Sequence, residues 1–272
     1  MDWLTDKVSF AIAVLFYGIS MVYSVFLWRK GFRQDNRVNY YLLLGAAVFH
    51  TTAMVKRGFS LERCPVNNLF EATMFVTWTM VATYLVFGIW SRLRFLGAFT
   101  SPVLFAIGIF ALMPGLDVRG TEPEFGGGLA SLHATLILLS YGAFGLSCIA
   151  GIMYITQEHD LKFHKLRAVF SLLPPMERLE KVMNWLLISG FILLTIGLAQ
   201  SPFLLKQKFD VYFTSDPKLI WSIIVWAIYL TLILMHTRFA QTGRRFAWGA
   251  VGTFAFVLLT FWGVNLLSPA HN

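Results

Sequence analysis

The chain has 272 residues, of which 57% are hydrophobic and only 13% are charged. An ordinary soluble domain carries about 25% charged residues, so this composition excludes a typical water-soluble fold. The formal net charge is +8, but the basic residues lie at the ends of apolar runs rather than along one polar face, which argues against a nucleic-acid-binding protein.

Long apolar runs predict membrane-spanning helices, since about 20 apolar residues are needed to cross roughly 30 Å of hydrocarbon. We expect eight spans at residues 8–28, 38–55, 69–90, 95–114, 129–156, 182–203, 219–236 and 247–267. The alternation typical of membrane strands is missing from these runs. The run after Lys7 lacks a small-residue cleavage site, so we interpret it as a first span and not as a signal peptide. The sequence therefore predicts an all-α polytopic membrane bundle, with residues 1–272 as one domain.

Lysine and arginine residues divide unequally between the two sets of loops. Fourteen of the 22 basic residues fall on one side, and such a surplus marks the cytoplasmic side of a membrane protein. Both termini and a loop at 203–218 are then expected on the outer, periplasmic side. Lys206, Lys208 and Lys218 lie in that loop. They would suit a ligand with carboxylates, or they are helix-end side chains that reach the interface.

Local signals indicate where two of the spans begin. Asn68 and Glu71 have the N-x-x-E spacing of a capping box at the start of the third span. Asp216 and Pro217 have the residue types of an N-cap and a first helical position at the start of the seventh.

Common enzyme motifs are missing from the sequence. The two cysteines, Cys64 and Cys148, lie far apart and form no C-x-x-C pair. The chain also lacks G-x-S-x-G, H-E-x-x-H and Walker A patterns. The sequence therefore gives no support to a hydrolase or a thiol-redox enzyme.

Histidines are the strongest candidates for binding a metal or cofactor. His133 lies just inside the outer end of the fifth span, and His271 lies just beyond the eighth. Both fall on the side of the 203–218 loop, and histidine is a common axial ligand of haem iron. The plainer alternatives are a helix-end imidazole bonded to a carbonyl for His133 and a tail residue for His271.

His50 and His236 lie within or at the ends of spans. Ionisable residues at membrane depth are costly and usually face the bundle interior or a cavity. His236 is also the last of three polar residues spaced seven apart on one face of its span, and His133 is the first of three on another. We call each such set a polar seam. Polar residues in this pattern can serve only to form interhelical hydrogen bonds. The two seams are Ser222, Tyr229 and His236, and His133, Ser140 and Ser147.

Aromatic residues gather around the expected outer loop. Phe209, Tyr212 and Phe213 lie in it, and Trp221 lies one turn into the next span. Aromatic residues at this depth often form only a belt at the membrane interface. Alternatively, these aromatic side chains stack against a flat macrocyclic ligand, and the 203–218 loop then forms a platform that holds this ligand.

Six segments in a fixed order resemble the cytochrome c assembly family, in its CcsA/HemX branch, which is related to CcmC. The most specific elements are P-x-x-N-L-[FY]-E and H-x-x-x-x-x-x-S-Y. The matching segments are FHTTAMVKRGFSLERCPVNNLFEA (49–72), LHATLILLSYGAFGL (132–146), YITQEHDLKF with LLPPMERLEKV (154–182), ISGFILLTIGL (188–198), SDPKLIWSIIVWAIYL with HTR (215–238) and WGVNLL (262–267).

The resemblance implies non-covalent, b-type haem held at an outer loop between two histidines. On this chain the iron ligands would be His133 and His271, and the platform would be the loop at 203–218. His236 matches a further family histidine, His50 matches one of less defined role, and Asp216 matches the aspartate of the family's W-D-P-[KR]-E motif. This chain departs from that motif, because residues 203–218 contain no tryptophan and Ser215 and Leu219 replace the Trp and the Glu.

The resemblance leads us to expect a multi-pass protein of the bacterial inner membrane that presents or delivers haem in cytochrome c maturation. Expected partners are haem, a second membrane subunit and apocytochrome c, and any haem-attachment activity would belong to that complex. One alternative is a HemX-like regulator that controls the abundance of an early enzyme of haem biosynthesis. A small-solute transporter is another, although no internal repeat is apparent in the sequence.

Overall fold

The computed structural model describes residues 5–29, 36–61, 68–89, 91–117, 127–162, 175–212 and 217–267. Within these ranges the secondary structure is helical and contains no strand. The elements are α1 (Asp6–Arg29), α2 (Arg37–Leu61), α3 (Leu69–Gly88), the 3-10 helix η1 (Ser91–Leu96), α4 (Gly97–Ala111), α5 (Gly127–Lys162), α6 (Met176–Phe209), α7 (Pro217–Arg238) and α8 (Arg244–Leu267).

The predicted polytopic helix bundle is confirmed. Within the described residues, seven segments are long and apolar enough to cross a bilayer: six lie within α1, α2, α3, α5, α6 and α7, and the seventh, Leu93–Ala111, begins in η1 and continues through α4. Helix α8 has 24 residues, which suffices by length at a rise of 1.5 Å per residue. Each predicted span corresponds to one helix, except that the span predicted at 95–114 is made by η1 and α4. The main differences are at the ends, where α2, α5 and α6 are longer than expected.

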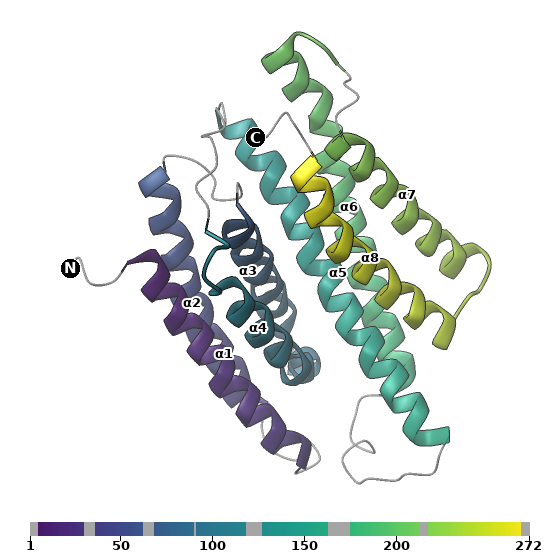
Figure 1. Ribbon diagram of the computed structural model, residues 1–272. Helices are drawn as coiled ribbons and strands as arrows, with labels where there is room; N and C mark the ends of the chain where they lie inside the picture. Colours follow the sequence, from purple (N-terminus) through teal and green to yellow (C-terminus); the bar gives the residue numbers. More distant parts are fainter. Residues whose placement is uncertain are drawn as a thin grey trace.

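The helices form two halves that meet along the middle of the molecule. Helices α1 to α4 pack together in one half and α5 to α8 in the other, and the main contact between the halves is α3 against α5 (Figure 1). Accordingly, 72% of the span in α3 and 78% of that in α5 are buried inside the protein, against 22% of the span in α7. The outer helices therefore present their apolar faces to the surroundings.

Successive helices run in alternating directions, so α1 begins and α8 ends at the same end of the bundle, at the top of Figure 1. We call this the upper end. Helix α5 also begins there, and α6 ends there. The opposite, lower end holds the turn between α7 and α8, and the end of α5 with the start of α6 (Figure 1). The two candidate groups of the sequence, near His133 and near His236, thus belong to opposite ends.

Helix α6 continues through Phe209, so the first seven residues of the loop expected at 203–218 are helical. Pro202 lies inside the helix without ending it. The helix ends where Asp210 adopts a left-handed conformation with φ 58°, and the Asp210 N–H donates to the Lys206 carbonyl. An ion pair of 2.6 Å between the Lys206 and Asp210 side chains reinforces this last turn. The prediction missed it because the segment mixes apolar and basic residues after a proline.

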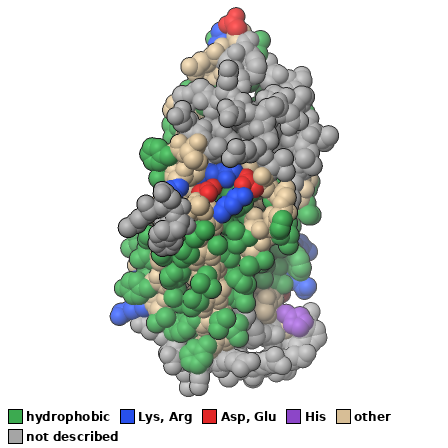
Figure 2. Space-filling view, turned by 60° about the vertical axis from the view of Figure 1, so that its left-hand side comes forward, with side chains coloured by type: hydrophobic (Ala, Val, Ile, Leu, Met, Phe, Trp, Pro, Cys, Tyr) green, Lys and Arg blue, Asp and Glu red, His purple; other side chains and the backbone are tan. Residues whose placement is uncertain are grey.

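An arginine near the end of α2 joins the upper ends of α1, α2, α3 and the segment after α4. The Arg57 guanidinium lies 2.9 Å from a Glu71 carboxylate oxygen, 3.0 Å from Asp6 and 2.5 Å from Asp117. Lys7 also pairs with Asp117, at 2.7 Å. Figure 2 shows acidic and basic side chains gathered above a band of hydrophobic ones on this side of the protein. We call these five residues the Arg57 network.

The capping box predicted at the start of α3 belongs to the same network. The Asn68 side chain accepts a hydrogen bond of 2.8 Å from the Glu71 N–H, as predicted. The Glu71 carboxylate, which is almost fully buried, bonds to Arg57. Asn68 also donates to Asp117. Burial alone would raise the pKa of Asp117, but hydrogen bonds from Arg57, Lys7 and Asn68 outweigh it and lower this pKa to about 2.

Small residues let α3 and α5 approach closely where the two halves meet. A Cβ atom on Gly142 of α5 would lie 2.7 Å from the backbone carbonyl of Thr79 in α3. Three residues along α5, a Cβ on Gly145 would lie 3.0 Å from the Phe254 ring and 3.1 Å from Met80. Close contact through glycine is a common way for membrane helices to pack, because apolar side chains gain little by leaving lipid.

Replacing Arg57 with alanine should lower the free energy of unfolding by about 3–5 kcal/mol, because the buried Glu71 carboxylate loses its ion pair with the Arg57 guanidinium. Unfolding in mixed detergent micelles measures the change. Arg178→Ala is the control, since Arg178 is exposed near the start of α6. Equal stability of the two variants would show that the Arg57 network does not hold the helices together.

Gly142→Ala should destabilise the protein by about 1–3 kcal/mol, because the new methyl group meets backbone atoms that have no side-chain freedom to move. Gly252→Ala in α8 is the matched control, since a Cβ there has open space. That control should be neutral or should gain up to about 1 kcal/mol from helix propensity. Thermal unfolding of the two variants in one detergent gives the comparison, and a neutral Gly142→Ala would contradict the close packing.

Candidate functional site

His133 is fixed by a hydrogen bond between the two longest helices. Its Nδ1 atom on α5 lies 2.8 Å from the carbonyl oxygen of Gly197 on α6. A carbonyl oxygen only accepts, so Nδ1 carries the proton and Nε2 of the neutral ring keeps its lone pair. Metal-binding histidines usually have this arrangement, with one ring nitrogen donating to a carbonyl and the other free for the metal.

His236 repeats the arrangement at the lower end. Its Nδ1 lies 3.2 Å from the backbone carbonyl of Gln241, in the turn between α7 and α8. The ring also stacks on Phe246 of α8, with 4.0 Å between the ring centroids. Nδ1 is therefore the protonated nitrogen here too, and Nε2 is the atom left to bind a ligand.

His50 is fully buried in the first half of the bundle. Its Nδ1 lies 2.9 Å from the Tyr17 hydroxyl of α1, and its ring contacts Phe10 at 4.9 Å between centroids. Its Nε2 has no hydrogen bond of ordinary geometry among the described residues, although the Met74 backbone lies close enough to the ring to interact with it. Tyr17 could not be identified as a partner from local sequence, because the two residues are 33 positions apart.

The structure separates these three histidines. The partners of His133 and His236 on α6 are Gly197 and Glu180, which are 17 residues or about 26 Å apart along the helix. His50 contacts α1 instead, in the other half. One iron atom therefore cannot join His133 to His236, and any binding at the two ends is binding at two sites.

The α5 seam predicted from heptad spacing bonds to α6 at two of its three positions. His133 bonds to the Gly197 carbonyl, and the Ser147 hydroxyl donates to the Met183 carbonyl at 3.0 Å. Ser140 instead donates to Ile137 within its own helix. His133 thus makes the interhelical hydrogen bond that was one of the two alternatives for its seam. Because this bond uses Nδ1, the lone pair of Nε2 stays available for a ligand.

The aromatic residues of the expected platform take different positions. Tyr212 is exposed just after α6, with the Lys206 ammonium 5.3 Å from its ring centre. The last residue of α6 is Phe209, twelve residues or about 18 Å along the helix from Gly197. The Phe209 side chain, Phe213, Asp216 and His271 lie outside what the structure describes.

Trp221 is buried between helices, not displayed at the surface. Its Nε1 donates to Thr260 of α8 at 2.9 Å, and its ring meets Tyr141 of α5 edge-on at 6.4 Å. It therefore connects α7 to α8 and α5.

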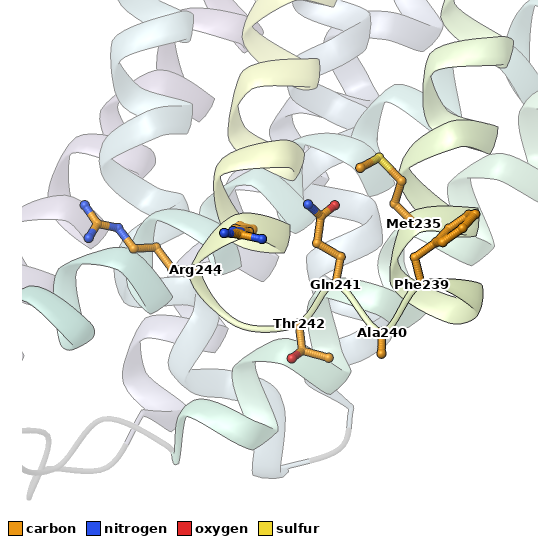
Figure 3. A pocket seen from close by; sticks show the side chains of 7 residues that line it. Met235, Phe239, Ala240, Gln241, Thr242 and Arg244 are labelled. Carbon is orange, nitrogen blue, oxygen red and sulfur yellow. The ribbon is translucent and has the colours of Figure 1, made fainter.

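A shallow pocket of about 550 Å³ lies beside the turn that holds His236. It is lined by Met235, Phe239, Ala240, Gln241, Thr242, Arg244 and Arg245. Figure 3 shows Met235 and Phe239 on one side of the Gln241 side chain and Arg244 on the other. Arg244 lies 3.7 Å from Glu158 of α5. Sequence reasoning did not point to this pocket.

Trp221→Phe should cost about 1–3 kcal/mol of stability, because the hydrogen bond to Thr260 is lost and the smaller phenyl ring leaves part of the buried space unfilled. Unfolding of haem-free protein in detergent tests this. Trp185→Phe, at a tryptophan that is 65% exposed, is the control and should be nearly neutral. If both variants are equally stable, the indole bond does not contribute.

Comparison with known proteins places the chain among relatives of similar length. It is 25% identical to the cytochrome c biogenesis protein CcsA of Trieres chinensis over an alignment 309 positions long, gaps included, which covers 98% of this chain and 96% of the relative. It is 27% identical to the protein HemX of Brevibacillus brevis, covering 96% and 94%. It is also 27% identical to CcsA of Marchantia polymorpha, covering 82% of each.

The family described as cytochrome C assembly protein matches residues 66–271, well over half of the chain. The match begins within the P-x-x-N-L-[FY]-E element, at its second residue, and ends at His271. It includes His133 and His236 but not His50. The chain is therefore a member of the cytochrome c assembly protein family, as its six ordered segments predicted.

Proposed function

We propose that this protein is an integral membrane haem-handling protein of cytochrome c maturation. Membership of the cytochrome c assembly family supports the pathway. The single observation that supports haem binding is the state of the histidines. His133 and His236 each donate from Nδ1 to a backbone carbonyl, which leaves Nε2 as a ready ligand.

Imidazole nitrogen is a common axial ligand of haem iron, so these residues fit the group chemically. We assign one site to the upper end, where His133 would bind the iron together with His271. The exposed ring of Tyr212 and the side chains of Phe209 and Phe213 would border this site, with Asp216 and Trp221 supporting the start of α7. The haem would be b-type, that is, held without a covalent bond.

His236 would serve a second site at the lower end, because about 26 Å along α6 separates it from His133. His50 is the third candidate, with Tyr17 holding its Nδ1 and no hydrogen bond of ordinary geometry at Nε2 among the described residues. Its full burial means that a ligand reaches it only if α1, α2 or α3 moves.

The proposal also includes the orientation of the helix bundle in the membrane. The surplus of basic residues assigns the lower end to the cytoplasm and the upper end, with both termini, to the outer side of a bacterial inner membrane. Haem would then be presented at the outer face to apocytochrome c, together with a second membrane subunit. Any thioether bond would be formed by that complex.

A HemX-like regulator of haem biosynthesis is the second candidate. The similarity to HemX of Brevibacillus brevis covers nearly the whole chain at an identity slightly above that to CcsA of Trieres chinensis. The absence of tryptophan from residues 203–218 also favours it. This function would act through the abundance of an early pathway enzyme. Deleting the gene would then change porphyrin levels and leave c-type cytochromes normal.

The visible absorption spectrum of the protein purified in mild detergent tests the haem proposal. The wild type should show a six-coordinate low-spin haem band. His133→Ala should lose the upper-end component and His236→Ala the lower-end one, because each removes one iron ligand. His159→Ala is the control, since His159 is an exposed residue in the last turn of α5. No haem in the wild type would contradict the proposal and favour the regulatory function.

A further inference from the structure

We propose that Glu180 of α6 is a positioning residue for His236. In this proposal its carboxylate holds the turn between α7 and α8 in the shape that fixes the His236 ring with Nδ1 protonated and Nε2 free. The importance of Nε2 for haem rests on the proposed function, whereas the effect on the ring does not.

The turn has a shape that needs outside support. Ala240 has φ 47° and Gly243 has φ 68°, both in the left-handed region. A left-handed conformation is unfavourable for alanine, so contacts around the turn must compensate for it. One internal bond, from the Gln241 N–H to the Met235 carbonyl at 3.1 Å, closes the turn. That bond holds Gln241, whose own carbonyl accepts from His236.

Glu180 supplies support from the neighbouring helix. One carboxylate oxygen, Oε2, accepts from the Gly243 N–H at 3.2 Å. The other, Oε1, lies 3.8 Å from Nδ1 of His236. Gly243 directly precedes α8, where backbone N–H groups have no partner within the helix and a negative charge is favourable. A single side chain thus contacts both the turn and the histidine that the turn holds.

The other sides of the turn are closed by packed residues. A Cβ on Gly243 would lie 3.0 Å from the Tyr154 hydroxyl of α5, and Tyr154 is 8% exposed. The His236 ring stacks on Phe246 of α8. The ring therefore rotates little, and its tautomer depends on whether the Gln241 carbonyl stays within reach of Nδ1. That carbonyl is set by the turn, and the turn is fastened to α6 by Glu180.

The test is nitrogen NMR of haem-free protein with ¹⁵N-labelled histidine, in which His236→Ala identifies the signal. The wild type should show His236 as the Nδ1–H tautomer. Glu180→Ala should give a mixture of tautomers, because the Gly243 N–H loses its acceptor and the turn relaxes. Glu180→Gln keeps an oxygen acceptor and should restore the single tautomer. Glu177→Ala is the matched control, since Glu177 lies one turn away and pairs with Lys181 on the surface.

Haem titration of the same proteins adds a second readout. Loss of the positioning contact should weaken binding at the lower end by about 10- to 100-fold, as for other residues that orient a ligating histidine. An unchanged His236 tautomer in Glu180→Ala would overturn the proposed role of Glu180. The same conclusion would follow if Glu180→Gln had neither the single tautomer nor the haem affinity of the wild type. A wild type that shows the single tautomer and binds no haem would refute the proposed function and leave the role of Glu180 standing.

Discussion

Polar groups inside a bilayer must find partners within the protein, and this constraint shapes the whole bundle. The Trp226 indole of α7 donates to Thr195 of α6 at 3.0 Å, and the Ser24 and Ser101 hydroxyls join α1 to α4 at 2.8 Å. The bond from His133 to Gly197 belongs to the same set. Because that bond uses Nδ1, the contact that packs the helices also leaves Nε2 unprotonated. Packing and ligand chemistry thus depend on one hydrogen bond.

The same constraint explains why charge is gathered at the ends of the helices. Arg57 is only 9% exposed and is acceptable there because three carboxylates surround it. Glu180 lies in the first turns of α6 and bonds to the start of α8. Each cluster ties together segments that are distant in the sequence. The Arg57 network links helices of the first half, and the hydrogen bond between Glu180 and Gly243 links helices of the second. Glycine contacts between α3 and α5 join the two halves.

The fold could be predicted from the sequence, and the site only partly. Runs of apolar residues locate helices directly, and the Asn68 capping box gave the start of α3. The end of α6 was missed, because the apolar run gives way to a segment with two lysines near residue 203, yet the helix continues to Phe209. His133 was found from its motif, but its partner Gly197 lies 64 residues away. Tyr17 and Glu180 carry no local signal, since their roles depend on helix packing.

The proposed function requires imidazole nitrogens of this chain to bind haem iron. Pulsed electron paramagnetic resonance of protein loaded with ferric haem and labelled with ¹⁵N-histidine tests this requirement, because hyperfine coupling identifies atoms bonded to the iron. Histidine ligation should give a low-spin signal with strong ¹⁵N coupling that disappears when unlabelled histidine is used. A haem signal without ¹⁵N coupling would show that the iron takes other ligands, and would refute histidine ligation.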